Sequence, residues 1–197
     1  MLETELKAVV PDEAAARTAL QHAGAQLVFI GQLVDHRYDT VARALYQRDV
    51  VLRVRTQREA AVARAQIDFK GPTSYRDGYK VRDEHSVSVG DAAGLAQILA
   101  FLGYVVTREI ERDVEVYELH DAIVRFERYP RMDLLVEVEG EPNAIEAAIQ
   151  SLGIARDGFT TERLGDFVLR FEARTGQRAA LCAAELEGTA AYVREDA

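Results

Sequence analysis

The chain begins with two glutamates and a lysine at every second position: Glu3, Glu5 and Lys7. Side chains of a β-strand alternate between its two faces, so in a strand these three residues would share one face. Carboxylate pairs are preferred by hard cations such as Mg²⁺ or Mn²⁺, whereas a lysine binds anions. The spacing therefore predicts either the solvated side of a sheet or the lining of a site that binds charge.

Later segments repeat this alternation of charged and apolar residues, and like charges recur at neighbouring positions of one face. The basic positions are Arg53, Arg55, Lys70, Lys80, Arg82, Arg108, Arg112 and Arg125, and the acidic ones are Glu84, Glu127, Glu137 and Glu139. Like charges side by side repel, so a bound counter-charge is expected. Arginine suits bidentate recognition of phosphate, and a closed sheet lined by both charge types would bind a polyphosphate chelated to metal. The alternative is that each charged face is simply solvated, as in most antiparallel sheets.

The elements that must position these residues are mostly strands. Helices are expected at 13–24, 91–103 and 143–153, each ending at a glycine, and a last helix is expected to start from Thr160 or Thr161 as its cap. Alternating segments within 2–10, 25–40, 50–57, 62–70, 79–89, 105–119, 122–129 and 133–140 predict strands. The chain after Leu181 shows no clear periodicity, which predicts loose attachment. The pattern indicates one α+β domain dominated by antiparallel strands.

Composition excludes several classes of protein. A net charge of -9 and a pI of about 5.0 argue against a nucleic-acid binder. No apolar run reaches membrane-spanning length, and the single cysteine, Cys182, cannot form an internal disulfide. We therefore expect a cytoplasmic protein with no membrane or nucleic-acid partner.

Several motifs, taken in order, resemble one family. ETELK resembles the ExExK signature of the CYTH superfamily, the triphosphate tunnel metalloenzymes, which include class IV adenylyl cyclases, thiamine triphosphatases and inorganic triphosphatases. LRVR (52–55), FKGP (69–72), KVRDE (80–84), a basic long strand and FERYPRMDLLVEVEG (126–140) follow in the family's order. FKGP followed by KVRDE is most similar to the class IV cyclase branch. The resemblance implies a tunnel domain over 1–175 and a C-terminal tail over 176–197.

The resemblance also implies a fold and a set of roles. The fold is a closed eight-stranded antiparallel β-barrel with helices packed outside, whose lumen holds a triphosphate and Mg²⁺ or Mn²⁺. The residues implied to bind phosphate are Lys7, Arg53, Arg55, Lys70, Lys80, Arg82, Arg108, Arg112 and Arg125. Glu3, Glu5, Glu137 and Glu139 would hold metal, with Glu84 and Glu127 in support, and Glu3, Glu5 and Lys7 are the implied catalytic residues.

Three positions and the spacing on the long strand depart from the family pattern. Glu127 stands where aspartate is usual, Ser86 where glutamate is frequent, and Arg37 where many members have tyrosine. The long strand does not indicate whether Arg108, Arg112 or both face the tunnel. The change at Arg37 weighs against a mechanism in which a tunnel tyrosine activates the nucleophile.

The motifs leave three functions open. The leading prediction is a metal-dependent triphosphatase, in which water attacks the terminal phosphorus with help from Glu3 or Glu5. A class IV adenylyl cyclase, in which the ribose 3′-hydroxyl of ATP attacks the α-phosphorus, is the first alternative, and a non-catalytic binder of polyphosphate or nucleotide is the second. The expected partner is a small-molecule triphosphate, and a homodimer is left open.

Overall fold

The computed structural model describes residues 2–192, and this part of the chain is mostly β-strand. The strands are β1 (Leu2–Val9), β2 (Gln26–Thr40), β3 (Val51–Glu59), β4 (Val62–Lys70), β5 (Ser74–Arg76), β6 (Tyr79–Val89), β7 (Tyr104–Leu119), β8 (Ala122–Arg128) and β9 (Leu135–Glu139). The helices are α1 (Glu13–His22), α2 (Ala92–Phe101), α3 (Pro142–Ser151), α4 (Leu164–Thr175) and α5 (Ala183–Glu187), and two short 3-10 turns occupy Tyr46–Arg48 and Arg156–Gly158.

The strands form a closed barrel, as the sequence predicted. Their order is β1-β9-β8-β7-β2-β3-β4-β6, and β1 also pairs with β6, so eight antiparallel strands complete a ring. The short β5, which was not expected, extends the sheet from β6 and lies outside the ring. Closure leaves the ring without a free edge, so inward and outward positions alternate along every strand.

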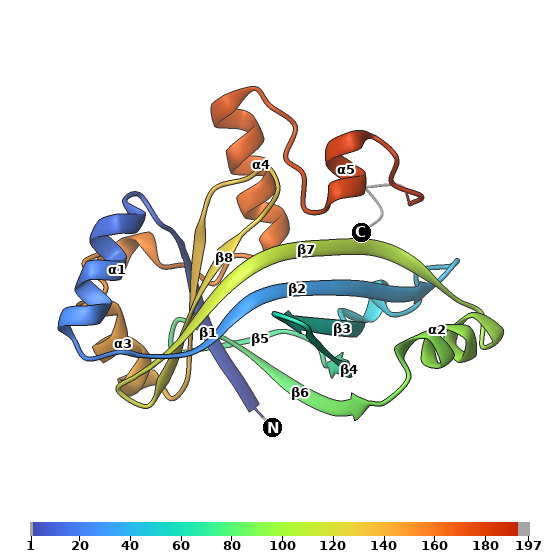
Figure 1. Cartoon of the computed structure of the whole chain (residues 1–197), viewed down its shortest axis with the longest axis horizontal. Coiled ribbons are helices and arrows are strands. Elements are labelled where there is room, and N and C mark those ends of the chain that lie inside the picture. The colour runs from blue at the N-terminus through green and yellow to red at the C-terminus, as the bar shows by residue number, and fades with distance from the viewer. Residues whose placement is uncertain (1, 193–197) are drawn as a thin grey trace.

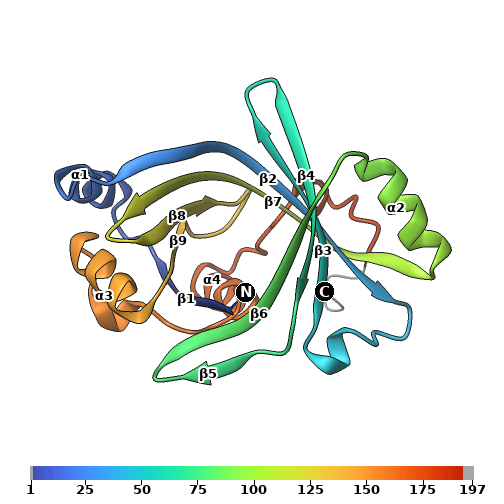
Figure 2. The ribbon, with the colours of Figure 1, turned by 90° about the horizontal axis from the view of Figure 1, so that it is seen from below.

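The main hydrophobic core lies outside the barrel, between its wall and two helices. Apolar positions of β1, β8 and β9, such as Leu6, Val124 and Val138, are at most 1% exposed and pack against α1 and α3. Figure 2 shows these two helices together on one side of the barrel and α2 on the opposite side. On β1, β8 and β9 the apolar half of the alternation is therefore used for packing, which leaves the charged half for the lumen.

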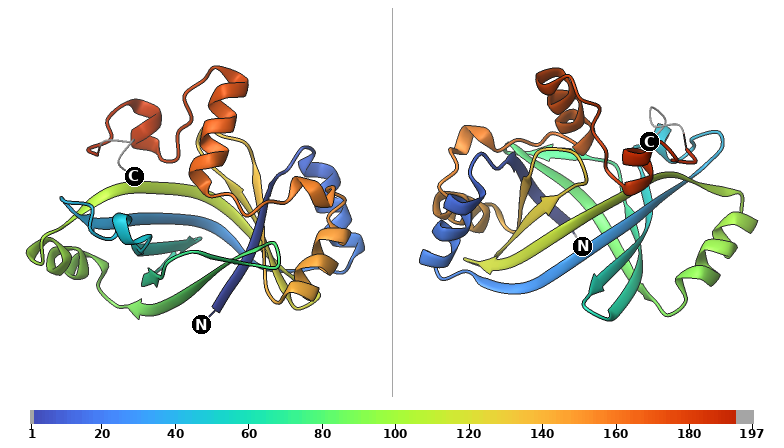
Figure 3. Two further views of the ribbon diagram at one scale, coloured as in Figure 1. Left: turned by 180° about the vertical axis from the view of Figure 1, so that it is seen from behind. Right: turned by 45° about the horizontal axis from the view of Figure 1, so that its top comes forward.

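A second core covers one part of the lumen. Phe167 and Phe171 of α4 pack with Ile110 and Leu135, which belong to the inward-facing rows of β7 and β9. Figures 1 and 3 show α4 and α5 above β7, away from α1 and α3. The helix α4 therefore closes one part of the lumen with apolar side chains.

Two expectations about the C-terminal region differ from the structure. The helix α4 begins at Leu164 and not after Thr160 or Thr161, because the backbone of Thr160 is held extended by hydrogen bonds of 2.9 and 2.8 Å with Lys7. Arg163 precedes the first turn, and its backbone N–H donates to the Asp166 carboxylate at 2.8 Å.

The chain after Leu181 was expected to be loosely attached. Of its described part, Cys182 is fully buried and Ala183 is held by β7, whereas residues 186–189 are exposed; residues 193–197 lie outside the described part of the chain. Leu181 and Cys182 are fully buried, and the backbone N–H of Glu111 on β7 donates to the Leu181 carbonyl at 2.7 Å. The Glu111 side chain in turn accepts a 2.8 Å hydrogen bond from the backbone of Ala183. This attachment depends on a distant strand, so local periodicity gave no sign of it.

Within residues 2–192, no helix combines the length and the apolar character that crossing a bilayer would require.

Replacing the buried Leu181 with alanine tests the attachment of the C-terminal segment. We expect Leu181→Ala to lower the free energy of unfolding by about 2–5 kcal/mol, because the lost methyl groups leave a cavity. Urea denaturation followed by circular dichroism measures the change. Leu186→Ala, at a position 44% exposed, is the control and should change stability by less than about 0.5 kcal/mol. Equal stabilities for the two variants would show that the segment is loosely attached.

Candidate active site

The barrel encloses a cavity of about 1300 Å³ that is lined by charged side chains from all eight strands of the ring. Every residue predicted from the sequence to bind phosphate or metal lies in this lining, and both Arg108 and Arg112 face it. The predicted set is Glu3, Glu5, Lys7, Arg53, Arg55, Lys70, Lys80, Arg82, Glu84, Arg108, Arg112, Arg125, Glu127, Glu137 and Glu139. Residues from positions as far apart in the sequence as Glu3 and Glu139 therefore meet in the lumen.

Four carboxylates on the neighbouring strands β1 and β9 form what we call the acidic wall: Glu3, Glu5, Glu137 and Glu139. Glu5 and Glu139 lie directly opposite each other in the pairing of β1 with β9. Burial and the nearby Glu137 raise the pKa of Glu139 to about 7. Like charges held so close in a poorly solvated place favour a bound cation.

Lysines and an arginine neutralise the acidic wall in the ligand-free protein. The Lys70 ammonium donates to both oxygens of Glu3 at 2.6 Å, and Lys80 donates to Glu5. Glu137 forms ion pairs of 2.8 Å with both Lys7 and Arg125. Burial opposes the charge of Glu137, but Arg125 and Lys7 hold the pKa of this carboxyl well below its usual range. Each of these cations is therefore engaged by protein carboxylates before any substrate arrives.

Glu127 lies between the acidic wall and the arginines. It is 1% exposed and accepts hydrogen bonds from Arg112 at 2.8 Å, from Lys7 at 3.2 Å and from the Tyr129 hydroxyl at 2.8 Å. Burial raises the pKa of Glu127, but Lys7 and Arg112 outweigh it and lower the value to about 2. Glu127 is therefore ionised at neutral pH and orients two of the predicted phosphate-binding cations.

Arginines dominate the opposite side of the ring, on the adjacent strands β3, β2 and β7. Strand β2 stands four places from β1 in either direction around the barrel, so it lies across the lumen from the acidic wall. We call this side the basic wall, defined by Arg37, Arg53, Arg55, Arg108 and Arg112. Its cations can meet phosphate oxygens on the face of a ligand turned away from the carboxylates.

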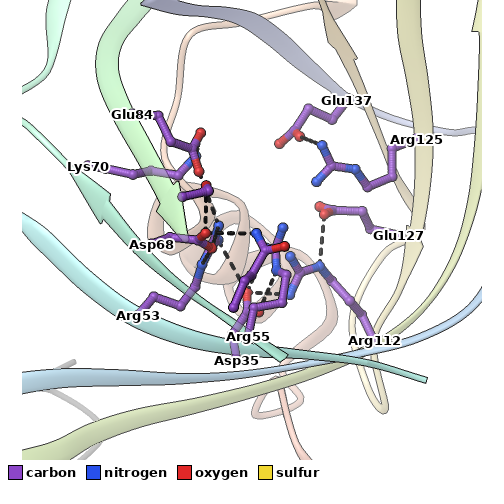
Figure 4. A network of polar contacts seen from close by, with 12 residues as sticks. Asp35, Arg53, Arg55, Asp68, Lys70, Glu84, Arg112, Arg125, Glu127 and Glu137 are labelled. Atoms are coloured by element: carbon purple, nitrogen blue, oxygen red, sulfur yellow. Dashed lines mark hydrogen bonds and ion pairs between the residues drawn. The ribbon is translucent and has the colours of Figure 1, made fainter. Parts of the chain in front are cut away.

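A single aspartate holds three arginines of the basic wall in place (Figure 4). Asp35 is 1% exposed and accepts hydrogen bonds from Arg55 at 2.7 and 2.8 Å, from Arg112 at 3.0 Å and from Arg53 at 3.3 Å. Burial alone would raise the pKa of Asp35, but Arg112, Arg53 and Arg55 hold it well below its usual range. The carboxylate therefore stays charged and fixes the directions of all three guanidinium groups.

A second buried aspartate anchors the far side of Arg53. Asp68 is fully buried and accepts from Arg53 Nη2 at 2.6 Å and from Ser86 Oγ at 2.7 Å. Arg82 is engaged differently, because its guanidinium donates to the carbonyls of Gly71 and Asp49, both at 2.7 Å. Arg82 therefore also links the chain segments at Gly71 and Asp49 to each other beside the cavity.

Sequence reasoning assigned no binding role to two charged lumen residues of β2, Asp35 and Arg37. They stand at alternate positions of one strand, the same spacing that marked the predicted pairs, and this spacing was the available signal. The sequence could not show that Asp35 would meet Arg53, Arg55 and Arg112, because these contacts cross from β2 to two neighbouring strands.

The donor chemistry of the acidic wall suits a hard divalent cation, because it offers only carboxylate oxygens. Within residues 2–192, no three such side chains are already gathered around a point where a metal would sit. The carboxylates that could hold a cation are Glu3, Glu5, Glu137 and Glu139, once they exchange their lysine partners for it.

Replacing Asp35 with asparagine tests its structural role in the basic wall. We expect Asp35→Asn to lower the free energy of unfolding by about 3–5 kcal/mol, because three buried guanidinium groups lose the charge that balances them. The measurement is urea denaturation at neutral pH. Asp113→Asn, at an exposed position of β7, is the control. An unchanged stability would contradict the proposed role of Asp35.

Solved structures share this barrel at low sequence identity. A candidate adenylate cyclase from Vibrio parahaemolyticus matches with a TM-score of 0.73 and 17% identity, over 86% of this chain and 98% of that one. A Pyrococcus horikoshii protein matches with a TM-score of 0.70 and 19% identity, over 85% and 98% of the two chains. A candidate adenylyl cyclase from Hippeastrum, described as having a dominant triphosphatase activity, matches with a TM-score of 0.52 and 13% identity over 95% and 97%. These similarities establish the shared fold.

A family model matches the sequence itself. None of the curated proteins matches the chain. The model of the CYTH domain matches residues 1–152, a range that contains every predicted site residue. The protein therefore belongs to the CYTH family.

Proposed function

We propose that the protein is a divalent-metal-dependent triphosphatase that binds its substrate inside the barrel. The observation that carries this proposal is the opposition of the two walls across one enclosed lumen. A triphosphate chelated to a cation presents negative oxygens on one side and a positive ion on the other. The lumen offers arginines to the first and carboxylates to the second, an arrangement that neither a plain anion site nor a plain cation site requires.

Substrate binding would proceed by exchange of ion pairs. Phosphate oxygens would take the cations that the carboxylates hold in the ligand-free protein, chiefly Lys7, Lys70 and Lys80, with Arg125. Glu3, Glu5, Glu137 and Glu139 would then be free to hold Mg²⁺ or Mn²⁺. The bound cation would neutralise charge on the phosphate oxygens as the P–O bond breaks.

The chemical step would depend mainly on preorganised charge. Arg55 and Arg112, fixed by Asp35, would stabilise the negative charge that develops on the leaving phosphate oxygens in the transition state. Glu3 or Glu5 would orient the attacking water and accept its proton, and Lys7 would hold the phosphoryl group in line. Since the arginines are positioned before the substrate arrives, little reorganisation is needed during the reaction.

An adenylyl cyclase is the alternative with specific support. The FKGP and KVRDE motifs resemble the class IV cyclase branch, and the Vibrio parahaemolyticus neighbour carries that description. The lining of the cavity also includes Val50, Val51 and the 64% exposed Tyr46, an apolar surface on which a nucleobase could pack.

Phosphorus NMR distinguishes the two reactions. The protein is incubated with ATP or with tripolyphosphate, each in Mg²⁺, Mn²⁺ or chelator. We expect orthophosphate from tripolyphosphate or ATP, and none in chelator. Cyclic AMP together with pyrophosphate would instead establish the cyclase and reject the triphosphatase, and release of orthophosphate in chelator would reject the metal requirement.

A single carboxylate change tests the acidic wall in catalysis. We expect Glu5→Gln to slow orthophosphate release by about 10²–10⁴-fold, because the water loses a proton acceptor and the cation loses a ligand. Glu59→Gln, an exposed position at the end of β3, is the matched control and should retain full activity. Full activity of Glu5→Gln would show that Glu5 of β1 has no role in catalysis.

The exchange of ion pairs predicts that metal and phosphate assist each other's binding. In calorimetry, we expect tripolyphosphate to bind about 5–150-fold more tightly in Mg²⁺ than in chelator, the usual range of coupling between two ligands. Glu3→Gln should lose most of this enhancement. In chelator, the same variant should bind tripolyphosphate at least as tightly as the parent protein, because Lys70 keeps only Glu84, at 3.1 Å, as a competing carboxylate. Equal affinities with and without Mg²⁺ in the parent protein would contradict the exchange.

A further inference from the structure

Arg37 differs from Arg53, Arg55 and Arg112 of the basic wall. Its side chain lines the cavity, and its Nε atom is buried without a hydrogen-bond partner among residues 2–192. In the same part of the chain, Arg53, Arg55 and Arg112 each donate to the Asp35 carboxylate. Arg37 thus lines the lumen without a hydrogen bond or ion pair to a carboxylate of residues 2–192.

Strand pairing places Arg37 in the middle of a row of three arginines. In the antiparallel register it lies opposite Arg53 on β3 and opposite Arg108 on β7. Arg53 is balanced by Asp68 at 2.6 Å, and Arg108 lies 3.9 Å from Glu185 of α5. The centre of the row is therefore the least neutralised part of the basic wall.

The surroundings of Arg37 disfavour its charge. Burial, together with Arg108 and Arg53, lowers the pKa of Arg37 to about 10, and the attraction of Asp35 does not compensate. The group is still protonated at neutral pH, so the folded protein bears the cost of a poorly balanced, buried cation. A residue that served only to stabilise the fold would not be placed in this way, whereas binding sites often sacrifice stability for function.

We infer that Arg37, flanked by Arg53 and Arg108, forms the subsite for the terminal phosphoryl group of the substrate. The inference rests on the proposed function and specifies which part of the ligand meets which part of the wall. A terminal phosphoryl group carries close to two negative charges at neutral pH, more than an internal one. The most negative group of a triphosphate is therefore matched to the most positive part of the lumen.

The test compares Arg37→Gln and Arg37→Lys with Arg64→Gln. Arg64 is an exposed residue of β4, so its replacement removes the same charge outside the lumen. Calorimetry with tripolyphosphate in chelator measures binding without turnover, and thermal unfolding without ligand measures stability. The expected loss of affinity is about 10–100-fold for Arg37→Gln, the effect of one hydrogen bond to a charged group, and smaller for Arg37→Lys. Arg64→Gln should bind like the parent protein.

Stability separates a ligand-binding role from a structural one. We expect the melting temperature of Arg37→Gln to stay the same or to rise, since a poorly balanced charge is removed. A fall of more than about 4 °C in both Arg37 variants would assign Arg37 to the fold and overturn the inference. Unchanged tripolyphosphate affinity in Arg37→Gln would overturn it as well.

A blocked ligand tests the terminal position. Arg37→Gln should weaken the binding of ATP more than that of ATP esterified with methyl on its γ-phosphate, because the ester carries less charge at that end. Equal losses for the two ligands would place Arg37 at an internal phosphoryl group and overturn the assignment. Failure of the parent protein to bind tripolyphosphate would instead reject the proposed function itself, so the two failures are distinguishable.

Discussion

The ion pairs around Asp35 are the interaction on which the lumen depends. Burying several arginines in one cavity is costly unless a carboxylate balances them, and Asp35 balances three from two neighbouring strands. Because the same contacts set the directions of the guanidinium groups, the charge balance of the folded protein and the geometry of its basic wall have one origin. Asp68 extends this arrangement on the far side of Arg53.

Across the lumen, the buried charges of the acidic wall are balanced in a different way. There the carboxylates are in excess, and flexible lysines compensate them in place of rigid guanidinium groups. A lysine ammonium can turn to a new acceptor without loss of geometry, whereas an arginine fork is matched to one carboxylate. The basic wall is thus suited to stay in place, and the lysines of the acidic wall are suited to exchange their partners.

The fold separates the part that provides stability from the part that binds ligand. Apolar side chains on the outer face of β1, β8 and β9 pack against α1 and α3. Closure of the ring through β1 and β6 joins the inward rows of all eight strands. Helix α4 is the exception, since it packs on inward positions and leaves the remainder of the lumen to charged residues. Costly charges can be retained in the lumen because the stability of the barrel comes from elsewhere.

The sequence by itself determined the alternation of charged and apolar residues, which predicted most strands and a charged face. Its motifs, through their resemblance to the CYTH family, implied the site residues that line the cavity, but not Asp35. Strand periodicity is local, so it can be read from neighbouring residues, and the order of the motifs indicated the closed barrel. Only the tertiary structure decided which charges meet. The contacts of Asp35, the isolation of Arg37, the late start of α4 and the attachment of Leu181 to β7 all join positions far apart in the chain. These features follow from register and ring closure, which no short stretch of sequence specifies.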